Sequence, residues 1–341
     1  MGMRRSTKGQ NRRLNSARLP PGFLLLPPTG DRTLASLHRK VRLLGLRAWI
    51  TAQHPSSDRV RAELEEDGHR ALARAGEPDV LPRLLCLAGG VLSAEECLAG
   101  IEAVSSGSGA PRVQVASGVH LALEDTNPLR DIEAHPGKDG NTLDLGGRAP
   151  DVWVAALRAA LDAIDEVLPE WSSGIRPFAM SRFVPVGYDP VEHRSASFRE
   201  APGLAYLSLH PDPLTMAEAI MHEAQHSALN LLSWFDPLLT NDPAQLAASP
   251  LRPDPRPLLG VLLAAHAFVP VAALHLRLAS RNHPLSEGPR FAERRAEVCA
   301  ANTEALEVLE AAARPTTAGA RVLQDLRVLH DAVAPSIHPL P

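Results

Sequence analysis

The stretch "TMAEAIMHEAQHSALNLL", residues 215–232, contains the pentapeptide His-Glu-Ala-Gln-His within a mostly apolar segment. Positions four apart lie on one face of a helix, so His222 and His226 can present their imidazoles to a common point. Glu223 follows one step round the same helix. These residues match the HExxH pattern, in which two histidines bind a metal ion and the glutamate reaches a metal-bound water or a neighbouring ligand.

Local chemistry also predicts where this helix begins. Thr215 and Glu218 stand three positions apart immediately before an apolar run, which is the spacing of a capping box. A helix is therefore expected from 215 to about 233.

The alternative to a metal site is a solvent-exposed helix that carries two histidines by chance. The apolar neighbours of the histidines leave little of the helix polar, and this favours the metal site. These neighbours are Ile220, Met221, Ala224, Leu229, Leu231 and Leu232.

A stable site needs a third ligand besides the two histidines. The segment "SALNLLSWF" that follows His226 lacks the glycine and histidine of the metzincin signature. A gluzincin would take a glutamate from a later helix, where Glu293 and Glu297 are the candidates.

His266 is the favoured third ligand. It lies in the apolar segment "LLGVLLAAHAFVPVAAL", where an unpaired polar group is costly. Pro270, four residues later, cannot donate a hydrogen bond to the carbonyl of residue 266 and is expected to kink the helix. The alternative is a core histidine bonded to a backbone carbonyl, and His275 is the second choice of ligand.

Two arginines precede this apolar segment in a proline-rich loop. Arg252 and Arg256 lie in "SPLRPDPRPLLG", and a guanidinium is the natural bidentate partner of a carboxylate. Three histidines can hold zinc for hydrolysis or iron for oxygen chemistry. An iron oxygenase that uses 2-oxoglutarate needs one arginine for the distal carboxylate of this co-substrate. The alternative is a surface turn whose arginines are ion-paired.

The combination of "AEAIMHEAQHSALNLL" with "SPLRPDPRPLLGVLLAAHAFVPVAAL" resembles the HEXXH motif-containing peptide-modification proteins of ribosomal peptide natural-product (RiPP) gene clusters. The resemblance covers about residues 110–310 and is most specific in "RPDPRPLLG". It implies an Fe(II)- and 2-oxoglutarate-dependent hydroxylase that acts on the β-carbon of a residue in a precursor peptide. It also implies a fold unlike the jelly-roll of ordinary 2-oxoglutarate oxygenases.

The resemblance assigns roles to individual residues. The iron ligands are then His222, His226 and His266. Glu223 orients a ligand or an iron-bound water, and one of the two loop arginines, Arg252 or Arg256, binds 2-oxoglutarate. The expected partners are the precursor peptide and molecular oxygen.

Two other classes of function stay open. In a zinc metallopeptidase, Glu223 would instead act as the general base that activates a metal-bound water. In a peptide-binding protein that is not an enzyme, the metal would be structural.

The order of predicted elements indicates an α+β fold that is predominantly helical. A small antiparallel sheet is expected to pack against a helical metal-binding core and to offer an edge for an extended peptide. The strands are expected in the hairpin-like "RVQVASGVHLALED" and in "RPFAMSRFVPV", "HRSASFRE" and "GLAYLSLH"; helices are expected at 151–169, 258–281 and 288–312.

The flexible run "SSGSGAP", 105–111, is the best candidate for a domain boundary. The predicted organisation is a disordered basic arm at 1–30, a helical N-terminal region at 31–105, the HExxH metal-binding domain at 110–312, and a C-terminal helix and tail at 313–341.

Composition and charge indicate which partners and which compartment to expect. A net charge of −4 argues against a general nucleic-acid binder. The longest apolar run, Leu258 to Leu274, is interrupted by a histidine and a proline, so no membrane span is expected. Three cysteines without CxxC spacing, Cys86, Cys97 and Cys299, indicate buried thiols in a reducing compartment, and we expect a cytoplasmic protein.

Overall fold

The computed structural model describes residues 34–52, 67–68, 72–106, 110–129, 142–250 and 254–334. These residues divide into two compact units at position 237/238. The sheet unit comprises the described residues up to Pro237, and the helical unit comprises those from Leu238 onward. The predicted basic arm at 1–30 and the end of the tail after 334 lie outside the described residues.

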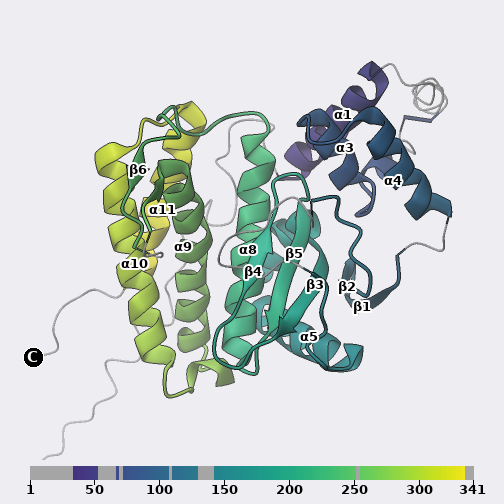
Figure 1. The fold of residues 1–341 in the computed structure, drawn as a ribbon. Coiled ribbons are helices and arrows are strands. Elements are labelled where there is room, and N and C mark those ends of the chain that lie inside the picture. Colours follow the sequence, from purple (N-terminus) through teal and green to yellow (C-terminus); the bar gives the residue numbers. More distant parts are fainter. Residues whose placement is uncertain are drawn as a thin grey trace, which may run out of the picture. The chain divides into compact units, whose positions relative to one another are not determined.

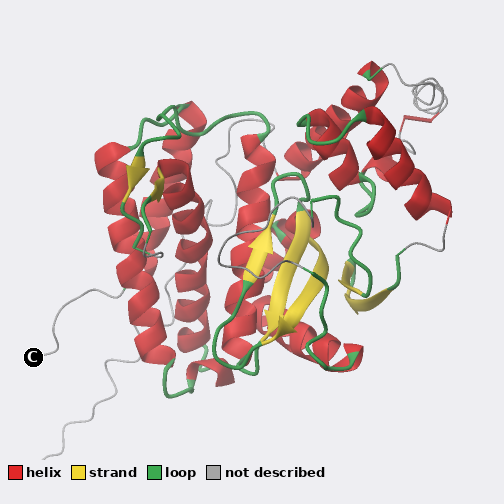
Figure 2. Cartoon of the chain, viewed as in Figure 1, coloured by secondary structure: helices red, strands yellow, loops and turns green. Residues whose placement is uncertain are grey.

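The sheet unit is built on five strands in the order β1-β2-β3-β5-β4 (Figures 1 and 2). The pairs β1–β2 and β4–β5 are antiparallel, whereas β2–β3 and β3–β5 are parallel. The strands are β1 (Arg112–Ala116), β2 (Val119–Ala122), β3 (Met180–Tyr188), β4 (Ser195–Ser197) and β5 (Gly203–Leu209).

The sheet is therefore mixed, and the expectation of an antiparallel sheet was wrong for its centre. Parallel neighbours require a crossover connection, and helix α5 (Pro150–Val167), predicted at 151–169, lies in the chain between β2 and β3. The first residues of the predicted strand "RPFAMSRFVPV" form the short helix α7 (Arg176–Ala179) instead. The protein is thus a mostly helical α+β protein with a mixed five-stranded sheet and a small two-stranded sheet.

Helices cover the sheet. Helix α8 (Pro213–Ser233) packs against α5 and against strands β5 and β4, and Figure 1 shows α5 and α8 behind the sheet. The helices that precede the sheet, predicted as a helical region, are α1 (Leu34–Thr51), α3 (Leu81–Ala88) and α4 (Ala94–Ser106); α6 (Pro169–Gly174) follows α5.

The helical unit consists mainly of three long helices. Helix α9 (Leu258–Ser280) packs against both α10 (Phe291–Ala312) and α11 (Thr317–Val333), and a short ladder joins β6 (Leu246–Ala247) to β7 (Arg256–Pro257). A single turn of 3-10 helix, η2 (Pro284–Ser286), lies between α9 and α10. The helices predicted at 258–281 and 288–312 are confirmed.

Helix α9 is the one helix in the described part of the chain with the length and apolar composition to cross a membrane. Most of its residues are buried, including both histidines, His266 and His275. A core helix of a soluble protein passes the same test of length and composition, so the feature is weak evidence for a membrane span.

All three cysteines are free thiols and are buried, as the sequence predicts. Cys86 lies in the core cluster on one face of the sheet, with Val184 and Tyr206. Cys97 lies in a second cluster, with Trp49 and Leu84, between the helices that precede the sheet. Burial raises the pKa of both thiols to about 12.

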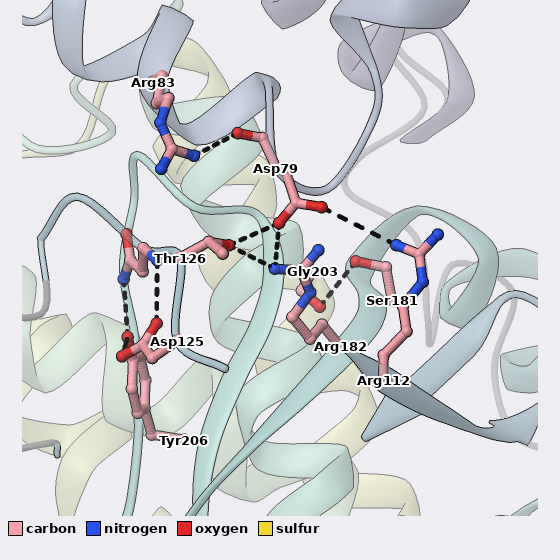
Figure 3. A network of polar contacts seen from close by, with 10 residues as sticks. Asp79, Arg83, Arg112, Asp125, Thr126, Ser181, Arg182, Gly203 and Tyr206 are labelled. Carbon is pink, nitrogen blue, oxygen red and sulfur yellow. Dashed lines mark hydrogen bonds and ion pairs between the residues drawn. The ribbon is translucent and has the colours of Figure 1, made fainter. Parts of the chain in front are cut away.

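A buried ion pair joins the segment before α3 to the central strand β3 (Figure 3). The guanidinium of Arg182 is 2.6 Å from Asp79 Oδ1, and only 3% of the Arg182 side chain is exposed. The Thr126 hydroxyl accepts a hydrogen bond from Arg182 and donates one to Asp79. Arg83 donates to the backbone carbonyl of Asp79, and the half-exposed Arg112 lies 3.9 Å from its carboxylate.

The surroundings of Asp79 have opposing effects on the pKa of its carboxyl. Burial raises the pKa of the carboxyl, but hydrogen bonding and attraction by Arg182, helped by Thr126 and Arg112, outweigh it, so the pKa is lowered from 3.8. A carboxyl with a depressed pKa in the folded state contributes stability above its unfolded pKa and loses it as the pH falls further.

We predict that Arg182→Met lowers the free energy of unfolding by about 3–5 kcal/mol, because it leaves the Asp79 carboxylate buried without its charge partner. Arg112→Met should cost less than about 1 kcal/mol, because that pair is long and exposed. All four tryptophans lie in the sheet unit, so their fluorescence in a denaturant titration measures the change. In the wild type the contribution should persist at neutral pH and decline below about pH 4. Equal costs for the two variants would contradict the assignment.

Candidate metal centre

Asp212 caps the helix that carries the HExxH motif. Its Oδ1 accepts a hydrogen bond from the Leu214 backbone amide at 3.1 Å, and its Oδ2 accepts one from the Thr215 hydroxyl at 3.0 Å. Pro213 occupies the first helical turn, where its missing amide proton costs nothing. The helix thus begins at Pro213, two residues earlier than the predicted capping box at Thr215 and Glu218, and that prediction of the cap was wrong.

The two motif histidines meet on one side of α8. The Nε2 atoms of His222 and His226 are 2.8 Å apart, and their rings stand edge to face with centroids 4.3 Å apart. Both side chains are partly exposed, whereas most of the helix is buried. The sequence prediction that these imidazoles share one face is confirmed.

Glu223 lies beside this pair and is almost completely buried, with 2% of its side chain exposed. Its Oε1 is 3.9 Å from Nε2 of His222. Its Oε2 is buried and has no hydrogen-bond partner among the described residues. A buried carboxylate oxygen without a partner is costly, so it is typically satisfied by a bound water or ligand.

Three further polar side chains of the sheet unit belong to this environment. His193 precedes β4, His210 follows β5, and Glu218 lies one turn before His222 on α8. His193 interacts electrostatically with His210, Glu218 and Glu223. Sequence reasoning missed them, because "VEHRSASFRE" gives no motif that pairs His193 with a helix 30 residues later.

The predicted third ligand, His266, lies on α9 in the helical unit and is 9% exposed. The second choice, His275, is completely buried on the same helix, with its ring 5.5 Å from that of Phe291. Glu293 and Glu297 are exposed on α10, and Glu297 lies 3.6 Å from Arg294.

The structure describes only one of the two arginines that are predicted to bind the co-substrate. Arg256 lies in β7, partly exposed, with its Nε 3.3 Å from the carboxylate of Asp254. Arg252 lies outside the described residues. Arg256 is thus ion-paired with a nearby exposed carboxylate, which is the arrangement of the alternative, and its role toward a co-substrate stays a prediction.

Within the described ranges, no group of three or more His, Cys, Asp or Glu side chains is arranged to hold a metal ion. The structure therefore brings together two of the predicted ligands, His222 and His226, with Glu223. The third ligand stays a prediction.

Comparison with known proteins adds no family assignment. No protein-family model matches this chain, and no curated protein matches its sequence.

We predict that Asp212→Ala lowers the free energy of unfolding by about 1 kcal/mol, because the Leu214 amide loses its acceptor at the start of α8. Thr215→Ala should cost less, since Thr215 supports the cap only through Asp212. Tryptophan fluorescence in urea compares the two. A larger loss for Thr215→Ala would restore the capping box as the main cap.

We also predict that His222→Ala and His226→Ala each weaken Fe(II) or Co(II) binding by at least roughly 10-fold, because each removes one converging imidazole. Equilibrium dialysis under anaerobic conditions measures the loss. His120→Ala, a change at a partly buried histidine on β2, is the matched control and should bind metal like the wild type. Unchanged binding in both motif variants would remove the metal site.

Proposed function

We propose that this chain is an Fe(II)- and 2-oxoglutarate-dependent oxygenase that hydroxylates the β-carbon of a residue in a ribosomally made precursor peptide. The observation that carries the proposal is the pair of Nε2 atoms, 2.8 Å apart on α8, with the buried Glu223 beside them. Two metal–nitrogen bonds of about 2.1 Å that meet near a right angle separate their nitrogens by about 3 Å. The imidazoles therefore need little movement to bind one ion.

The donor set fits iron but does not select it, since neutral imidazoles bind iron and zinc alike. The preference for iron comes from the resemblance of the motif and of the arginine-containing loop that follows it. When bound, iron with 2-oxoglutarate supplies the oxidation of a C–H bond by molecular oxygen, with release of succinate and carbon dioxide.

The residues of the chain supply binding and orientation. His222 and His226 hold the ion, and the sequence predicts His266 as the third ligand. Glu223 orients a ligand or a bound water, because its carboxylate lies next to His222 and is shielded from solvent. Arg252 or Arg256 binds the distal carboxylate of 2-oxoglutarate, and in Arg256 this carboxylate would replace that of Asp254.

A peptide substrate suits the sheet unit. Strand β4 is the last strand at one edge of the sheet, runs antiparallel to β5, and packs against α8. An extended peptide can add to a sheet edge through backbone hydrogen bonds, which read the backbone more than the side chains. A segment bound along β4 would run beside the helix that carries the two histidines.

The buried Glu223 also favours a second candidate, a zinc metallopeptidase. In that enzyme a carboxylate next to the two histidines acts as the general base toward a metal-bound water. The two candidates differ in product, since one adds an oxygen atom and the other cleaves a peptide bond.

We predict that the purified chain, incubated anaerobically with Fe(II) and then with oxygen, ascorbate, 2-oxoglutarate and the peptide encoded beside its gene, adds one oxygen atom to that peptide. Mass spectrometry reads the peptide, and succinate release is measured in parallel. His222→Ala, His226→Ala and His266→Ala should each abolish the product, and His120→Ala should retain it. A product in His266→Ala would transfer the role of third ligand to another residue.

Cleaved peptide without succinate would establish the hydrolase instead. In that case Glu223→Gln should lower the turnover number by roughly 10²–10⁴-fold, as expected for the loss of a general base. Binding of the peptide without either reaction would indicate a peptide-binding protein.

A further inference from the structure

Two buried polar atoms near the candidate metal centre have complementary chemistry. Nε2 of His193 and Oε2 of Glu223 are both buried, and neither has a hydrogen-bond partner among the residues that the structure describes. Nε2 of His193 can carry a proton and donate it. Oε2 of Glu223 acts only as an acceptor when the carboxylate is ionised. Buried polar atoms of this kind are normally satisfied by each other, by an ordered water or by a ligand.

The fold brings the two side chains to the same part of the sheet unit. His193 stands two residues before β4, and β4 packs against α8, which carries Glu223. The side chains are close enough that Glu223 and Glu218 act electrostatically on the imidazole of His193. No direct hydrogen bond joins the two side chains, since neither buried atom has a partner among the described residues, so a link between them needs a bridging group.

The Ser208 hydroxyl contacts the other ring nitrogen of His193. The Ser208 hydroxyl lies 3.3 Å from Nδ1 of His193, and its oxygen accepts a hydrogen bond from the Arg194 backbone amide at 2.8 Å. The Arg194 amide occupies one lone pair of that oxygen and leaves the hydroxyl proton available for Nδ1. When Ser208 donates to Nδ1, a neutral imidazole carries its proton on Nε2.

The imidazole of His193 is neutral near neutral pH. Burial lowers the pKa of His193 to about 4, with a further contribution from His210, and the carboxylates of Glu223 and Glu218 only partly oppose this. His193 thus has one N–H group, which donation from Ser208 to Nδ1 places on the buried Nε2.

We propose that His193 is a positioning residue that donates its Nε2 proton, through one bound water, to Oε2 of Glu223. The chain of hydrogen bonds then runs from the Ser208 hydroxyl to His193, to the water and to the carboxylate. It fixes the rotation of the Glu223 carboxylate and leaves Oε1 directed to His222. The catalytic consequence rests on the proposed function, in which Glu223 orients a group at the metal; the hydrogen-bond chain itself does not.

The first test uses metal-free, full-length protein labelled with ¹⁵N-histidine. Long-range ¹H–¹⁵N spectra identify which nitrogen of each imidazole carries a proton, and His193→Gln assigns the resonance. We expect the proton on Nε2, a shift of the His193 nitrogens in Glu223→Gln, and no shift in Glu287→Gln, an exposed carboxylate on the helical unit. A proton on Nδ1, or nitrogens that do not respond to Glu223→Gln, would overturn the proposal.

The second test measures peptide hydroxylation. His193→Leu should lower kcat by roughly 10–100-fold and change KM for the peptide by less than about threefold. Effects of this size are expected when a group is lost that holds a residue at the metal in position by a hydrogen bond. His193→Gln, whose terminal amide can place a donor near the Nε2 position, should recover most of the activity. His120→Leu is the matched control for loss of a partly buried imidazole in the same unit.

A double-mutant cycle separates positioning from a general effect on folding. Once Glu223 is Gln, adding His193→Leu should reduce kcat by less than about twofold, because the water no longer has its carboxylate. Reductions that multiply would contradict the proposal, and so would an inactive His193→Gln that melts like the wild type. If no hydroxylation is seen in the wild type, the proposed function fails, and the spectra of the metal-free protein still decide the role of His193.

Discussion

The packing of α8 against β4 and β5 is the constraint on which the candidate centre depends. A helix held on one side by a sheet has a fixed rotation about its own axis, because its apolar residues must face the sheet and the helices around it. Fixing that rotation also fixes where positions 222 and 226 point. The same packing buries Glu223, so the histidines keep partial exposure while the carboxylate between them is shielded.

A second constraint comes from the charged group at the centre of the sheet. Arg182 projects from β3, the strand with a parallel neighbour on each side, and binds Asp79 in the segment before α3 (Figure 3). Burying two charges together is tolerable only when their geometry is well satisfied, and Thr126 completes it here. The network ties the helices that precede the sheet to the strands, so the sheet unit includes residues on both sides of the predicted boundary at 105–111.

Local patterns in the sequence were reliable where the chemistry is local. Ser93 and Glu96 stand three apart at the start of α4 and form a capping box, in which each side chain accepts a hydrogen bond from the backbone amide of the other. The capping box predicted at Thr215 and Glu218 does not cap its helix. Asp212, three residues before Thr215, accepts the hydroxyl proton of Thr215 and caps the helix instead. Spacing alone does not show that a better cap precedes it.

Long-range relations were harder to predict. Alternating residues indicated strands but not their direction, which depends on the crossovers between them. The i, i+4 spacing of His222 and His226 predicted their convergence, because the helix itself brings them together. His193 comes near Glu223 only through the pairing of β4 with β5 and the packing of α8, and no pattern in its own neighbourhood encodes either.

The burial of the cysteines has a practical consequence for the study of this chain. With the pKa of Cys86 and Cys97 near 12, only on the order of one thiol in 10⁵ is ionised at neutral pH. Neither sulfur is then an effective nucleophile toward peroxide or toward another thiol. These two thiols therefore need no protection by dithiothreitol, a reagent that strips loosely held metals.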